Sequence, residues 1–105
     1  MYYLITLHYP EADMPNVVVL AHGSDEESAL KAGFRQVALE KADDRADEII
    51  AEFEDLSIED LKEFGFCTDT RKYRSRLTLL EVEQIESSEY QCLCKFAEKL
   101  DIYVQ

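Results

Sequence analysis

Near Gly23 the spacing of the apolar residues changes from a strand period to a helix period, and that change constrains the fold more than any other feature. Up to Tyr9, the chain has a period-2 pattern rich in aromatic and β-branched residues, and the run Val17-Val18-Val19-Leu20-Ala21 is apolar throughout. Both patterns are typical of β-strands, the second of a strand covered on both faces. From Leu30 to Leu56, apolar residues recur every three or four positions, as in helices. We therefore expect two strands, the second inside the sheet, followed by a helical region.

Capping patterns indicate where the helices begin. Ser24 with Glu27 forms a capping box, which predicts a helix start with Ser24 as its cap. Residues 25–56 then contain a single glycine and no proline, but two poor helix formers stand together at Asp43-Asp44. The sequence therefore allows either one long helix or two helices joined near Asp43.

A second capping box, Ser57 with Asp60, predicts one further short helix. Gly65 stands where a left-handed C-terminal cap of that helix belongs. The segment 66–75 has no clear period and is interpreted as a loop.

The last third of the chain alternates between the two periods. Residues 77–85 indicate a third strand, in which Leu79-Leu80 shifts the alternation and marks either a bulge or a strand covered on both faces. Residues 89–100 fit both periods, and a capping pattern at Ser88 favours the helix. Residues 102–104 form a short final strand or a docked tail.

These elements predict an α+β fold. We expect a small single domain over residues 1–105, because 105 residues suffice for one core only and 47% of them are hydrophobic. A mixed or antiparallel sheet of three to four strands should be covered by acidic amphipathic helices, in the order β-β-α-(α)-α-β-α-β.

The negative charge is concentrated in the helical middle of the chain. The formal net charge is -12, and residues 40–63 hold 11 acidic and 3 basic residues, a balance of -8. On a helix, the carboxylates of this segment lie opposite its apolar side chains. The candidate partner-binding residues on that side are Glu40, Asp43, Asp44, Asp47, Glu48, Glu52 and Asp55.

This charge distribution favours binding over catalysis. A broad basic face for nucleic acid or anionic lipid is absent, so neither direct nucleic-acid binding nor membrane binding is expected. The sequence indicates a non-enzymatic binding protein that regulates or inhibits a basic protein, with a solvated surface as the alternative interpretation. Carboxylates three or four positions apart on a helix lie about 5–6 Å from each other, which resembles the spacing of successive phosphates along a nucleic-acid strand. The partner class therefore includes nucleic-acid-handling proteins, for which the carboxylates would act as a nucleic-acid mimic.

One basic run stands against this acidity, and we take it as a secondary binding site. It either contacts a ligand directly or pairs with the acidic helices within or between subunits. Its members are Arg71, Lys72, Tyr73, Arg74 and Arg76.

Two other function classes stay open. One is a small enzyme or enzyme subunit with a pocket at the strand-helix junction near His22 and Ser24, although a backbone-bonded histidine and a capping serine explain both residues structurally. The other is a homo-oligomeric assembly or accessory protein that joins copies through sheet edges or the basic run. Asp44 and Glu48 have spacings suited to magnesium, but such carboxylates point away from the core, so no metal or cofactor is expected.

The remaining features concern the compartment. Cys67, Cys92 and Cys94 are an odd set without C-x-x-C spacing, which indicates neither a disulfide framework nor a thiolate metal site. The segment 1–9 lacks the basic start of a signal peptide, and no apolar stretch approaches the length of a membrane span. We expect a cytoplasmic protein.

Overall fold

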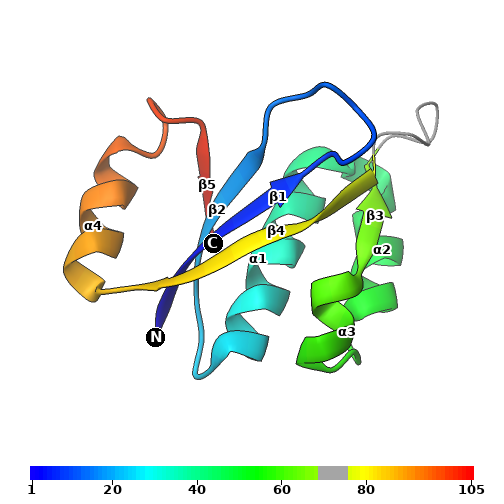
Figure 1. Ribbon diagram of the computed structural model, residues 1–105, viewed down its shortest axis with the longest axis horizontal. Coiled ribbons are helices and arrows are strands. Elements are labelled where there is room, and N and C mark those ends of the chain that lie inside the picture. The colour runs from blue at the N-terminus through cyan, green and yellow to red at the C-terminus, as the bar shows by residue number, and fades with distance from the viewer. Residues whose placement is uncertain (69–75) are drawn as a thin grey trace.

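A mixed β-sheet organises the computed structural model, which describes residues 1–68 and 76–105 apart from the side chain of Asp43. The described residues form five strands in the spatial order β3-β4-β1-β2-β5 (Figure 1). β1 pairs antiparallel with both β2 and β4, β3 pairs antiparallel with β4, and β5 pairs parallel with β2. Their bounds are Tyr2–His8 (β1), Val17–His22 (β2), Gly65–Cys67 (β3), Arg76–Ile85 (β4) and Ile102–Val104 (β5).

The strand number exceeds the expected three to four, while the α+β class, the mixed sheet and the interior place of β2 are confirmed. The additional strand is β3, which was expected to be part of a loop. Three residues are too few to display a period, so β3 becomes a strand only through its pairing with β4.

The helical region is divided. The residues that follow β2 form α1 and α2 with a short 3₁₀ turn between them at Asp43–Arg45, so the interpretation as two helices is the correct one. Within residues 1–68 and 76–105, no helix has the length and apolar character needed to cross a membrane. The helices are α1 (Glu26–Lys41), η1 (Asp43–Arg45), α2 (Ala46–Phe53), α3 (Ile58–Glu63) and α4 (Ser87–Phe96).

The cap of α1 lies one residue later than expected. Asp25, in extended backbone, is the N-cap, and its Oδ1 accepts a hydrogen bond of 2.8 Å from the backbone N–H of Ser28. The prediction that Ser24 caps this helix is therefore wrong. The bonds that Ser28 donates lower the pKa of the Asp25 carboxyl, because they stabilise its charged form.

Side chains also cap α3 and α4. The Ser57 hydroxyl accepts a hydrogen bond from the backbone N–H of Asp60, which confirms the predicted start of α3. The helix predicted over residues 89–100 is present, but it runs from Ser87 to Phe96, and its cap is Glu86 and not Ser88. The Glu86 side chain accepts a hydrogen bond from the backbone N–H of Glu89, and the Glu89 side chain accepts one from the backbone N–H of Glu86. The two bonds form a complete capping box.

Gly65 does not cap α3. The helix ends at Phe64 in extended backbone, φ -71° and ψ 139°, and Gly65 begins β3 opposite Thr78. The predicted left-handed cap is therefore wrong. A Cβ at position 65 would collide with the Arg76 side chain on the neighbouring strand, so glycine serves close approach at this position. Of the predicted loop 66–75, residues 69–75 lie outside the described part of the chain.

β4 contains a bulge opposite β1. Thr6 is paired with Glu81 and Leu7 with Leu79, so Leu80 is the additional residue. The shift at Leu79-Leu80 therefore marks a bulge, one of the two alternatives that the sequence allowed. Leu80 is 52% exposed on the sheet face that α1–α3 leave open.

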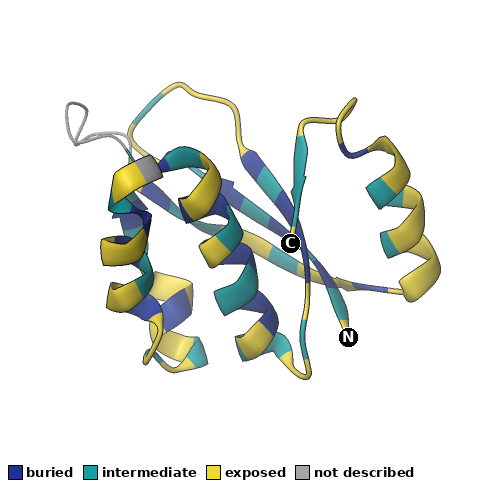
Figure 2. Ribbon diagram, turned by 180° about the vertical axis from the view of Figure 1, so that it is seen from behind, coloured by how far each residue is buried: buried dark blue, intermediate teal, exposed yellow. Residues whose placement is uncertain are grey.

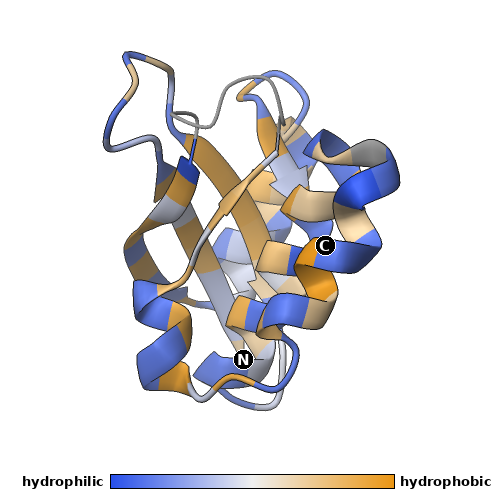
Figure 3. Cartoon of the chain, turned by 90° about the vertical axis from the view of Figure 1, so that its right-hand side faces the viewer, coloured by the Kyte–Doolittle hydropathy of each residue, from blue (hydrophilic) through white to orange (hydrophobic). Residues whose placement is uncertain are grey.

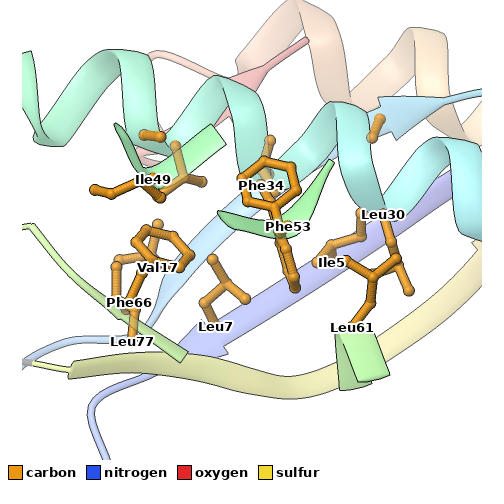
Figure 4. Close-up of a cluster of buried hydrophobic side chains, with 14 of the residues drawn as sticks. Ile5, Leu7, Val17, Leu30, Phe34, Ile49, Phe53, Leu61, Phe66 and Leu77 are labelled. Carbon is orange, nitrogen blue, oxygen red and sulfur yellow. The ribbon is translucent and has the colours of Figure 1, made fainter. Parts of the chain in front are cut away.

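One face of the sheet and the three helices α1, α2 and α3 enclose the main core (Figure 2). Ile5 and Leu7 of β1 point toward Phe34 and Phe53, whose rings meet edge to face with centroids 5.7 Å apart (Figure 4). These side chains are almost fully buried, and Leu61 of α3 closes the same cluster. The helices are thereby held in fixed orientations on the sheet.

The opposite face of the sheet is covered only at one end, by α4. Leu20 and Ile85 are buried there, and the rings of Tyr2 and Tyr90 lie 4.5 Å apart. Burial raises the pKa of the Tyr90 phenol, and the adjacent Cys94 adds to the shift. α4 itself has no fully buried residue between its ends, so it packs less tightly than α1.

Candidate functional site

The predicted partner-binding carboxylates gather on the outer side of the helical layer. We call this the acidic surface, formed by the end of α1, η1, α2 and the residue pair that follows α2. Hydrophilic residues line the outer sides of the helices (Figure 3). The exposed members are Glu40, Asp44, Asp47, Glu48, Glu52 and Asp55, while Asp43 contributes its backbone to η1.

The packing of the inner side keeps this surface outward. Ala46, Ile49 and Phe53 of α2 are buried in the main core, and Ala42 is buried just before η1. A rotation of α2 that hid its carboxylates would expose these apolar groups to water, which costs about 25 cal/mol per Å² of apolar area. The acidic surface is therefore a fixed feature of the fold.

Few cations approach the acidic surface. Arg45 Nε lies 3.8 Å from Glu48 Oε2, and the Gln36 amide donates a 3.0 Å hydrogen bond to Glu40. In the part of the chain that the structure describes, no other carboxylate of the acidic surface lies within 4.0 Å of a basic group. The guanidinium of Arg45 is also engaged elsewhere, because its Nη1 donates to the carbonyl oxygen of Cys67. The negative charges of neighbouring carboxylates are therefore neutralised only weakly by basic groups.

The two ends of α2 differ in how they tolerate acids. Asp47 and Glu48 occupy the first turn, where the helix dipole favours negative charge. Glu52, Glu54 and Asp55 lie at the other end, where the dipole disfavours it, and the last turn of α2 has no basic residue. The helix dipole therefore explains why Asp47 and Glu48 are acidic, but it does not explain the three acids at the other end of α2.

The secondary site can be assigned only at one residue. Arg71, Lys72, Tyr73 and Arg74 lie outside the described residues. Arg76 is the first residue of β4, is exposed, and pairs with Cys67 in the sheet register.

The strand-helix junction contains an aromatic group. The exposed His22 ring lies 6.2 Å from Tyr2 and 6.1 Å from Tyr90, and the His22 backbone N–H donates to Gln105 Oε1 at 2.8 Å. Ser24 is exposed and does not cap α1. Two cavities flank β5, and neither is lined by His22 or Ser24.

The carboxylates around Asp44 have a spacing that, in the sequence, suits magnesium. Across residues 1–68 and 76–105, no three His, Cys, Asp or Glu side chains converge in a way that could hold a metal ion. Sequence reasoning did not find the cavities beside β5, because they arise where segments far apart in the chain meet a three-residue strand.

Comparison with protein-family models, with curated proteins and with solved structures gave no match. Function is therefore inferred from the surfaces of the chain itself.

Proposed function

We propose that the protein is a non-enzymatic binding protein that regulates or inhibits a basic protein through the acidic surface. The carboxylates at the C-terminal end of α2 are the observation that carries this proposal. Glu52 and Asp55 oppose the helix dipole and repel their acidic neighbours, at a cost of about 0.3–1 kcal/mol for each dipole contact. Charges that weaken their own helix are typical of surfaces selected for function.

The chemistry of the partner follows from the charge. A basic surface would replace the missing counter-charges, and the long-range attraction would accelerate the encounter. By occupying a basic site, the protein would exclude any other anionic ligand of that site, nucleic acid included. Occlusion of this kind makes a small acidic protein a regulator or an inhibitor.

The test uses two pairs of neutral, nearly isosteric substitutions. Glu52→Gln with Asp55→Asn removes two charges from the acidic surface. Glu81→Gln with Glu83→Gln removes two exposed charges from β4, on the other side of the sheet. The unmodified protein and both variants are used as bait for affinity purification from the native host, and captured proteins are identified by mass spectrometry.

We expect the unmodified protein and the β4 variant to capture the same basic protein, and the α2 variant to lose it. The α2 variant should at the same time unfold at an equal or higher temperature, because it removes unfavourable charge from the helix end. Equal capture by all three baits contradicts the proposal, as does equal loss in both variants. With the purified partner, competition by a single-stranded oligonucleotide then determines whether the occupied site binds nucleic acid.

A further inference from the structure

The outer edge of β5 presents backbone groups that no strand of the described residues pairs. β5 is the last strand of the sheet and, among the strands of the described residues, pairs only with β2. The Gln105 N–H donates to the Leu20 carbonyl of β2 at 2.9 Å. Because consecutive residues of a strand direct their backbone groups to opposite sides, the N–H and C=O of Val104 point away from β2. This is the geometry to which an additional strand can pair.

A cavity of about 410 Å³ opens at the start of this edge. Tyr9 and Val17, both almost fully buried, form its floor with Ile102 and Tyr103 of β5. The volume falls within the range of about 300–1,000 Å³ that is usual for binding pockets. A partner side chain can therefore be accommodated beside the open edge.

The charged groups around this cavity divide into two sides. Glu98 and Asp101 stand on the α4 side, and no basic group of the described residues lies within 4.0 Å of either carboxylate. On the α1 side, the Lys41 ammonium lies over the Tyr103 ring, 5.9 Å from its centroid. Asp101 has a left-handed backbone, φ 56°, directly before β5. The backbone thus holds one carboxylate at the entrance to the edge.

A second cavity, of about 380 Å³, lies at the opposite end of β5. It is lined by Gln105, by Lys31 and Arg35 of α1, and by Ile50 and Phe53 of α2. In Figure 2, β5 lies between α1 and α4, with its C-terminal end beside α1. On the outer side of β5, the Ile102 N–H already donates to the Ala97 carbonyl at 2.9 Å, so the open part of the edge is at Val104, between the two cavities.

We infer that this edge binds an extended segment of a partner protein as an added strand. Main-chain hydrogen bonds to Val104 supply the pairing, an apolar side chain enters the cavity between Tyr9 and Tyr103, and a basic residue faces Glu98 and Asp101. The residues proposed to bind this segment are not members of the acidic surface, although Phe53 and Glu54 line the second cavity. A second copy of this chain is a weaker occupant, because each copy has a net charge of -12.

Val104→Pro is the decisive substitution. It removes the outward N–H of Val104 while the bond from Gln105 to β2 stays intact, and proline is tolerated on edge strands at such positions. Val104→Ala is the matched control, because it shortens the side chain but keeps the N–H. A third variant combines Glu98→Gln with Asp101→Asn, since asparagine also tolerates the left-handed backbone at position 101.

The probe is a phage-displayed library of random seven-residue peptides, selected on the unmodified protein. The enriched peptide is then synthesised, and its Kd is measured for every variant. We expect a basic residue next to an apolar one, about tenfold weaker binding to Val104→Pro, and a change under about twofold for Val104→Ala. The Glu98 and Asp101 variant should weaken binding about tenfold and reduce its salt dependence. If Val104→Pro does not fold, as judged by circular dichroism, the charge variant decides alone.

Three results would overturn the inference. The first is the absence of any enriched peptide. The second is a peptide that binds Val104→Pro, or the charge variant where that proline variant is unfolded, as tightly as the Val104→Ala control. The third is a concentration-dependent dimer of the unmodified protein, observed by analytical ultracentrifugation, that Val104→Pro dissociates, since the occupant would then be a second copy.

Discussion

Arg45 Nη1 donates a 3.0 Å hydrogen bond to the carbonyl oxygen of Cys67, and this bond joins η1 to the end of β3. A charged donor on a partly buried carbonyl contributes roughly 1–2 kcal/mol. Arg45→Ala should therefore lower the free energy of unfolding by about that amount, measured by urea denaturation. Arg35→Ala, an exposed arginine on α1, is the control and should change stability by less than about 0.5 kcal/mol. Equal losses in both variants would show that the bond to Cys67 contributes nothing.

Phe53 and Phe96 differ in burial, and their substitutions should therefore differ in their effect on stability. Phe53 is buried against Phe34, whereas Phe96 of α4 is 48% exposed. Phe53→Ala should cost about 3–5 kcal/mol, because it leaves a cavity in the main core. Phe96→Ala should cost less than about 1 kcal/mol, because solvent already reaches half of the ring. The midpoints of thermal and urea unfolding measure both, and a reversed order would contradict the assigned packing of α2 and α4.

Acid should weaken the cap of α1. The pKa of Asp25 is lower in the folded protein than in the unfolded chain, because Ser28 donates to the charged carboxyl. The stabilisation is thus complete above the unfolded pKa and is lost as the pH falls through the lowered folded value.

Asp25→Asn keeps a capping side chain but removes this titration. The difference in Tm between the unmodified protein and Asp25→Asn should therefore shrink as the pH is lowered from 7 to 2. Ser24→Ala should leave the pH profile unchanged, since Asp25 and not Ser24 is the cap. A difference that stays constant over this range would exclude a contribution from Asp25.

The three cysteines should react at different rates. Cys92 is exposed on α4, whereas Cys67 and Cys94 are half-buried. A thiol reagent such as DTNB should therefore modify one thiol of the folded protein rapidly and the two others slowly. Cys92→Ser should remove the rapid phase, and Cys94→Ser should keep it. A rapid phase that survives in Cys92→Ser would mean that α4 presents another face to solvent.

The sequence predicted the elements that carry a long period and missed those that depend on pairing. β1, β2 and the core side of α2 were predictable because each repeats its pattern over several residues. β3 was not, since Gly65–Cys67 becomes a strand only against the ten-residue β4. The α1 cap was misplaced because Ser24 and Asp25 are adjacent capping residues with equally suitable partners three positions later.

The candidate sites also differ in how far the sequence could predict them. The outward position of Glu48 and Glu52 follows from the apolar Ala46, Ile49 and Phe53 on the opposite face of the helix, a pattern that the sequence already displays. The edge of β5 and its cavities could not be predicted, because Tyr9, Lys41 and Tyr103 meet only in the folded chain. Their proximity is a product of topology, for which no local pattern exists.

The parallel pairing of β5 with β2 also has a kinetic consequence. It joins residues 84 positions apart, such as Val18 with Ile102 and Leu20 with Val104, and closing so large a loop is slow. α4 contributes no residue to the main core and β5 packs against it only through the partly buried Tyr103, so these two elements are held less firmly than the helical layer. We therefore expect the amides of α4 and β5 to be the unit that opens first and closes last in hydrogen exchange, which would let the edge strand sample open states under native conditions.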